Sequence, residues 1–430
     1  MKIKNKSIFL TKKDLLKLSI CFVLIYLGFH FTFFDKSKPI ENNIVKIEAI
    51  KPYFSSVFEA GRNWPSHYGN SDNNLKLHYT FQKDLTKKIK SLLKKYKSDY
   101  SSVVVIDNKT GGILSAVGYT RKNNSFNLSL PFSSTHPSAS LFKIITMASL
   151  LEQGKLTLDS NHTFSGKSNT LYKNQLFKKP HYRWQRTLSL NEAFAKSNNV
   201  IFGKAALQYL DKNLVNIMAH KFGFNQDLMM ELSLGQSFFE VPKDDYNLAE
   251  IASGFNKETM ISPIHAALLS SVIANKGIIK YPFIISKLTD EKNRKLLIKP
   301  NLQKKRVIKK STSELISKAM VNTVKKGTAR KSFRRFNRFL KQQLVLGGKT
   351  GSITGGIPFG KRDWFSAFAV PKNKALGEGI SISVMNINVD KWFVRSTYLA
   401  REVIDYYYEE INPLKEMITS LNESKSAEKI

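Results

Sequence analysis

The alternation of apolar and polar positions predicts one early hairpin and one late group of strands. Residues 103–106 are an apolar run, DNKTGG supplies turn residues, and 113–117 returns as a second strand. Three further strand-like pieces lie at 344–349, 364–370 and 380–387, separated by Gly, Pro or charged residues. A short strand is also predicted at 75–80.

Between and around these strands the apolar residues recur at helical spacing. Ser189 and Glu192 have the spacing of a capping box at the start of one helical region. The polar residues from 412 onward predict a frayed tail. The predicted helices are 81–96, 141–153, 189–210, 213–222, 263–275, 312–326 and 392–411.

This order of elements favours an α+β fold over alternating β-α-β units. The early hairpin can pair with the late strands to form one antiparallel sheet flanked by helices. The helices between them then form a second, mostly helical subdomain. No fixed-period repeat divides the chain.

The N-terminal residues predict a membrane anchor. Residues 15–34 are an apolar block of 20, interrupted by Lys17, which is the length that a transmembrane helix needs. The preceding lysines put residues 1–14 in the cytoplasm and the rest of the chain outside it. A cleaved signal peptide is the alternative, but DKSKPIENN offers no small-x-small cleavage site. Residues 35–74, with three prolines, are interpreted as an irregular linker or stalk in which Tyr53, Phe54, Phe58 and Trp64 can pack.

Composition changes this picture only in part. The net charge of +35 over 430 residues would attract polyanionic partners, but much of it comes from lysines spread along the chain, which favours a simple compositional bias. A location outside the cytoplasm argues against nucleic acid and for anionic lipid or wall polymer. The segment KKGTARKSFRRFNRFLKQQ could make such a contact, or it could be a solvated loop. The single cysteine, Cys21, lies in the predicted anchor, and no Cys/His spacing indicates a metal site or a cofactor.

Candidate chemistry begins at SASLFKIIT, where Ser140 and Lys143 lie one helical turn apart. By itself this pair is better explained by a helix cap at Ser140 and a solvated Lys143. Two later motifs change that interpretation. KSNN gives Ser197-x-Asn199, and GGKTGS gives Lys349-Thr350-Gly351-Ser352 at the end of a predicted strand.

Ser-x-x-Lys, Ser-x-Asn and Lys-Thr-Gly in this order resemble the signature of penicillin-binding proteins and serine β-lactamases. VVVIDNKTGGILSAVG is similar to the family's opening hairpin, and VKKGTAR resembles its Gly-Thr-Ala turn. The resemblance covers about 75–411, which we interpret as the catalytic domain, with 412–430 as a C-terminal tail. Ser352 stands where the family's transpeptidases commonly have Thr, and Ala139 where the family often has Gly.

The resemblance implies a role for each motif residue. Ser140 would be the acylated nucleophile, Lys143 its general base and Ser197 a proton relay to the leaving amine. Asn199 would hold the substrate amide, and Lys349 would supply positive charge. Thr350 and Ser352 would bind the substrate carboxylate, with Gly351 leaving room beside them. The backbone N–H groups of Ser140 and Ser352 would form the oxyanion hole.

The implied function is that of a membrane-anchored D,D-transpeptidase that cross-links peptidoglycan stem peptides and is acylated by β-lactams. It would act at the bacterial cytoplasmic membrane. Residues 35–74 are too few for a glycosyltransferase domain, so a separate glycosyltransferase is expected as a partner. A D,D-carboxypeptidase or β-lactamase would use the same acylation machinery. A non-catalytic penicillin-binding sensor or scaffold is the alternative from another class.

Overall fold

The computed structural model describes residues 47–59, 63–69, 74–178, 183, 185–229, 231–232, 234–290, 295–296 and 304–427. The predicted cytoplasmic segment 1–14 and the predicted anchor 15–34 lie outside these residues. Within the described ranges, every helix is too short or too polar to form a transmembrane span.

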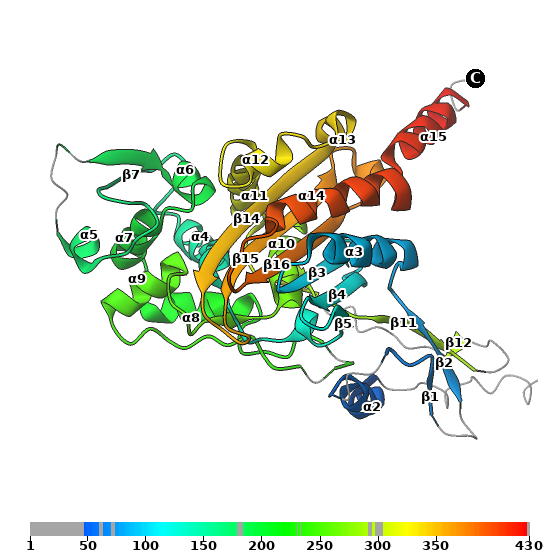
Figure 1. Ribbon diagram of the computed structural model, residues 1–430. Coiled ribbons are helices and arrows are strands. Elements are labelled where there is room, and N and C mark those ends of the chain that lie inside the picture. Colours follow the sequence, from blue (N-terminus) through cyan, green and yellow to red (C-terminus); the bar gives the residue numbers. More distant parts are fainter. Residues whose placement is uncertain are drawn as a thin grey trace, which may run out of the picture. The chain divides into compact units, whose positions relative to one another are not determined.

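The predicted hairpin and the predicted late strands form one antiparallel sheet (Figure 1). Its strand order is β14-β15-β16-β3-β4-β5, so the late strand β16 pairs directly with the early strand β3. This confirms the expected pairing of the two regions. The strands are β3 (Tyr100–Asp107), β4 (Ile113–Thr120), β5 (Ser125–Asn127), β14 (Leu344–Thr354), β15 (Lys361–Pro371) and β16 (Ile380–Asn388).

One face of this sheet is covered by α3 (Lys83–Tyr96) and α14 (Ser396–Tyr406). Alternate strand residues such as Val103, Ile382 and Phe365 pack against them in the main hydrophobic core. This alternation is what the two-residue period of a strand requires.

The other face of the sheet packs against α10 (Pro263–Ala274), which is buried from Pro263 to Ile273. Small polar residues face it: Ser383 Oγ donates to the carbonyl of Pro263, and Ser366 Oγ to that of Ala266, both at 2.6 Å. These short side chains let the helix lie close to the strands. The helix α11 (Lys310–Lys325) contacts both α10 and β14.

The intervening residues build the predicted helical subdomain around α4 (Lys143–Glu152). The predicted helical region 189–210 is interrupted, because α6 ends at Ala195 and α7 begins at Asn199. The capping box at Ser189 and Glu192 is confirmed. The remaining elements are α5 (Lys173–Phe177), α6 (Leu190–Ala195), α7 (Asn199–Tyr209), α8 (Lys212–Lys221), α9 (Asp245–Ser253), β7 (Asn161–Phe164) and β8 (Arg186–Ser189).

Part of the predicted stalk is regular. Residues Ile47–Glu59 form α2 despite Pro52, because Ile50, Phe54 and Val57 lie on one buried side of the helix. The expected aromatic packing is present, since Phe58 and Trp64 contact the ring of Phe132. A small sheet follows, formed by β1 (His67–Tyr68), β2 (Leu75–Tyr79), β11 (Ile285–Thr289) and β12 (Lys295–Leu296).

Two other expectations are wrong. The tail from 412 is not frayed: it forms α15 (Leu414–Ala427), whose Leu414 is buried and whose Met417 packs against the core. The basic segment is not a solvated loop, because it forms α12 (Arg330–Phe333) and α13 (Arg338–Gln343). Phe333 and Phe336 insert into the core, so its aromatic residues are used for packing and are not free for a ligand.

Short elements complete the described chain. A one-turn 3₁₀ helix, η3, precedes α4, and a π-helical turn, η6, follows α14. The remaining short elements are β6 (His136–Pro137), β9 (Met260–Ile261), β10 (Ile278–Lys280), β13 (Lys304–Arg306), η2 (Leu130–Phe132), η3 (Ala139–Phe142), η5 (Lys374–Leu376) and η6 (Tyr407–Ile411).

Candidate active site

Ser140 lies in the one-turn 3₁₀ helix η3, directly before α4. The preceding residue, Ala139, has φ +49°, a backbone conformation that is uncommon for residues other than glycine. Gly254 packs against this turn, and a Cβ on Gly254 would overlap the carbonyl of Ala139. The close packing holds the Ser140 hydroxyl at a partly exposed position at the end of the helix.

Lys143 lies one turn further, and its side chain is completely buried. Its Nζ is 2.9 Å from Ser140 Oγ and 2.7 Å from Asn199 Oδ1, and it also donates to the carbonyl of Ser253. Burial lowers the pKa of Lys143 well below 10.5, and the charge of Lys349 lowers it further. A neutral amine has two N–H donors for Asn199 and Ser253 and one lone pair, which can accept the Ser140 proton.

Ser197 lies in the break between α6 and α7 and has φ +54°. Its Oγ accepts a hydrogen bond from Lys349 Nζ at 2.8 Å. Lys349 Nζ also donates to the carbonyl of Thr350 at 2.9 Å. Burial lowers the pKa of Lys349 from 10.5 to about 7, so its protonation changes near neutral pH.

The remaining residues of the Lys-Thr-Gly motif lie on β14, beside Ser140. A Cβ on Gly351 would lie 3.2 Å from Ala139 Cβ and 3.4 Å from Ser140 N, so a side chain there would crowd Ser140. Ser352 is exposed next to it. Thr350 Oγ1 is 2.6 Å from Thr328 Oγ1.

Thr328 was not among the predicted site residues, although the Gly-Thr-Ala turn that contains it was recognised. The turn is held against α6, because Thr328 N donates to the carbonyl of Ala195 at 3.1 Å. A Cβ on Gly327 would overlap that same carbonyl, which explains the glycine before the threonine. The Ser253 carbonyl was also missed, and no side-chain pattern in the sequence indicates it.

Asn199 is buried, and both ends of its side-chain amide have protein partners. Its Oδ1 accepts from Lys143, and its Nδ2 donates to the carbonyl of Asn169 at 3.2 Å. Its backbone N donates to the carbonyl of Ser168 at 2.7 Å. Asn199 therefore positions Lys143, and one N–H of its amide remains for a ligand.

The structure brings the three sequence motifs into one site. Ser140, Lys143 and Asn199 are connected by hydrogen bonds, and Ser197 is bonded to Lys349. The described part of the chain contains no group of three or more His, Cys, Asp or Glu side chains that could hold a metal ion.

Comparison with known proteins identifies the family. The family model of the penicillin-binding protein transpeptidase domain matches residues 101–376, well over half of the chain. The chain belongs to this family. The expected resemblance and the α+β, transpeptidase-like fold are thereby confirmed.

Two curated relatives match the family domain. Stage V sporulation protein D of Bacillus subtilis is 27% identical over 271 residues, which cover 60% of this chain and 40% of that protein. The peptidoglycan D,D-transpeptidase FtsI homolog of Mesostigma viride is 24% identical over 289 residues, which cover 60% and 47%. The match spans less than half the length of either relative.

Solved structures share the fold. The D,D-transpeptidase domain of a peptidoglycan glycosyltransferase from Eggerthella lenta has a TM-score of 0.64 at 18% identity, covering 81% of this chain and 90% of that one. Penicillin-binding protein 3 from Mycobacterium tuberculosis, in complex with aztreonam, has a TM-score of 0.64 at 17% identity, covering 79% and 80%.

Proposed function

We propose that this protein is a serine D,D-transpeptidase that cross-links peptidoglycan stem peptides through an acyl-enzyme on Ser140. The observation that carries the proposal is the environment of Lys143. Its amine is completely buried and lies 2.9 Å from the Ser140 hydroxyl, with Asn199 and Ser253 as its other partners. These partners and the lowered pKa suit a general base for that hydroxyl.

In the acylation step, Ser140 Oγ attacks the carbonyl carbon of the donor's penultimate D-Ala, and its proton passes to Lys143 Nζ. The backbone N–H groups of Ser140 and Ser352 stabilise the oxyanion. The peptide C–N bond then breaks, and the proton that Lys143 took is relayed through the Ser197 hydroxyl to the leaving amine, which returns Lys143 to its neutral form. Lys349 holds Ser197 in place by a hydrogen bond to its Oγ. The products are an ester on Ser140 and free D-Ala.

In the second step, the amine of an acceptor stem peptide attacks the ester and gives a proton to Lys143. The ester C–O bond then breaks, and Lys143 returns the proton to Ser140 Oγ, which regenerates both groups. Before the first step, the hydroxyls of Thr350 and Ser352 bind the terminal carboxylate of the donor, and Gly351 keeps the edge of β14 open for the donor. A β-lactam enters the same acylation step, which makes it a covalent inhibitor.

We also propose that residues 15–34 anchor the protein in the cytoplasmic membrane, with 1–14 inside and the catalytic domain outside. The apolar run and the lysines before it support this orientation. A separate glycosyltransferase would supply the glycan strands whose stem peptides are cross-linked.

The proposal is tested by labelling the purified protein with a fluorescent penicillin and identifying the acylated peptide by mass. We expect a long-lived adduct on Ser140 that is lost in Ser140→Ala and Lys143→Ala. Ser138→Ala is the matched control, because Ser138 is buried two residues away and its hydroxyl has no hydrogen-bond partner within the described residues. This control should be labelled at the wild-type rate.

Rapid release of the adduct would overturn the proposal in favour of a hydrolase. Labelling of Ser140→Ala at the wild-type level would refute the assigned nucleophile. A strain in which Ser140→Ala supports wild-type growth and cross-linking would favour the non-catalytic sensor or scaffold.

A further inference from the structure

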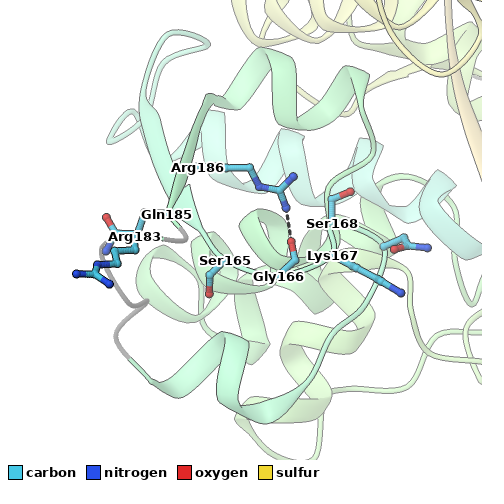
Figure 2. A pocket seen from close by; sticks show the side chains of 8 residues that line it. Ser165, Gly166, Lys167, Ser168, Arg183, Gln185 and Arg186 are labelled. Carbon is cyan, nitrogen blue, oxygen red and sulfur yellow. Dashed lines mark hydrogen bonds between the residues drawn. The ribbon is translucent and has the colours of Figure 1, made fainter.

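A cavity of about 790 Å³ opens beside the active site, in the helical subdomain (Figure 2). One wall is the loop between β7 and α5, and the other is formed by Arg183, Gln185 and the first residue of β8, Arg186. None of the mechanism proposed above uses it. Its lining residues are Ser165, Gly166, Lys167, Ser168, Asn169, Arg183, Gln185 and Arg186.

The loop wall is held rigidly by one buried side chain, Gln175. Its Nε2 donates to the carbonyls of Ser165 and Lys167 at 3.1 and 3.3 Å. Its Oε1 accepts from Thr170 Oγ1 at 3.0 Å and from Tyr172 N at 2.9 Å. Four bonds to one side chain fix the loop before any ligand arrives, and a preorganised wall lowers the entropic cost of binding.

The same loop is bonded directly to the catalytic groups. The carbonyls of Ser168 and Asn169 accept from the backbone N and the Nδ2 of Asn199. Asn199 in turn bonds to Lys143, which bonds to Ser140. The loop that forms one wall of the cavity is therefore bonded directly to Asn199.

The lining of the cavity is basic. It contains Lys167, Arg183 and Arg186 and no Asp or Glu. Among the described residues, no carboxylate lies within ion-pair distance of Lys167 or Arg186. Figure 2 shows the Arg186 guanidinium reaching across to the carbonyl of Gly166, to which it donates, and the same group lies 4.5 Å from the Phe164 ring. Its other N–H groups remain for a planar anion such as a carboxylate.

We propose that this cavity binds a carboxylate-bearing segment of the donor stem peptide, on the acyl side of the scissile bond. The inference rests on the proposed transpeptidase function. In that function the leaving D-Ala and its carboxylate lie at Lys349, Thr350 and Ser352, and the acyl side of the donor lies at Asn199. The loop wall of the cavity is bonded to Asn199, and none of its lining residues belongs to the Lys349–Ser352 motif, so the cavity is placed to receive what precedes the scissile bond.

The test compares two synthetic donors that end in D-Ala-D-Ala and differ at one group. One has a free carboxylate on a side chain upstream of the scissile bond, and the other has the corresponding amide. The acylation rate of Ser140 is measured with each donor by competition against a fluorescent penicillin. The variant is Lys167→Glu. It reverses one charge in the cavity lining, and the Lys167 side chain has no hydrogen bond or ion pair to the described residues that the substitution would break.

The matched control is Lys155→Glu, an exposed lysine that follows α4 and does not line the cavity. We expect Lys167→Glu to slow acylation by the carboxylate donor about tenfold, because attraction becomes repulsion, and to change the amide donor less than twofold. Lys155→Glu should leave both rates unchanged. Penicillin labelling of Lys155→Glu should stay at the wild-type rate.

Equal effects of Lys167→Glu on both donors, or no effect on either, would overturn the inference. A change confined to the ratio of amine to water attack on the acyl-enzyme would also overturn it, because the cavity would then bind the acceptor. Absence of penicillin labelling in the wild type would instead reject the proposed function, so the two failures are distinguishable.

Discussion

Replacing Lys349 with methionine should stabilise the protein at pH 6 while abolishing acylation. The Lys349 side chain is completely buried, and burial lowers its pKa from 10.5 to about 7. In the unfolded chain the amine keeps its proton up to about pH 10.5. Between pH 7 and 10.5 the unfolded state therefore binds more protons than the folded state, and wild-type stability rises with pH.

The magnitude follows from the two pKa values. A fall from 10.5 to about 7, at about 1.4 kcal/mol per pH unit, means that folding with a charged Lys349 costs about 5 kcal/mol below pH 7. Methionine removes this cost but also the bonds to Ser197 and Thr350, at about 1 kcal/mol each. The variant should be more stable by about 3 kcal/mol at pH 6. The difference should shrink by about 1.4 kcal/mol per pH unit above pH 7 and be close to zero at pH 9.

The assay is urea unfolding at pH 6 and pH 9, followed by tryptophan fluorescence, with penicillin labelling in parallel. Trp364 is completely buried and reports on the central sheet. Lys341→Met is the control, because Lys341 is exposed on α13, and it should change the free energy of unfolding by less than about 0.5 kcal/mol at both pH values. A Lys349→Met protein that is less stable than the wild type at pH 6, or a difference that does not depend on pH, would refute the reasoning.

Three further substitutions test the site and its supports. Gly254→Ala should reduce the free energy of unfolding by more than about 2 kcal/mol and abolish penicillin labelling. Gly254 has φ +63°, which strains an alanine, and the added Cβ would overlap the Ala139 carbonyl. A labelled, stable variant would contradict the assigned packing. Ser189→Ala removes the α6 cap and should cost about 1 kcal/mol in urea unfolding with labelling unchanged; unchanged stability would contradict the cap. Thr328→Val breaks the bond to Thr350 and should slow labelling several-fold, with the melting temperature kept within a few degrees; an unchanged labelling rate would show that the pair is dispensable.

The sequence predicted the central sheet well because its signals are local. The DNKTGG turn between two apolar runs fixes the β3–β4 hairpin, and the three late strands are separated by turn residues. The Ser-x-x-Lys, Ser-x-Asn and Lys-Thr-Gly motifs indicated which side chains would meet, because they occur in the order of the family signature. The distances between those side chains could not be derived from the sequence.

Other features could not be predicted because tertiary contacts decide them. Ser197 adopts φ +54° in a break between two helices, whereas its sequence reads as one continuous helical region. The Ser253 carbonyl reaches Lys143 only through the packing of α9 on the turn that holds Ser140. In the predicted stalk, three prolines obscured the spacing of Ile50, Phe54 and Val57 that places α2 against the core.

The pairing of β16 with β3 has a consequence for how the protein folds. Ser101 and Asn386 hydrogen-bond across these strands although they are 285 positions apart along the chain. While the chain is being synthesised, β3 lacks its partner until the residues of β16 have emerged, and its edge can pair wrongly with other strands. Such distant contacts also slow folding. The β3–β4 hairpin therefore cannot complete its sheet until the residues of β16 have been synthesised, and during this interval the unpaired edge of β3 is open to aggregation.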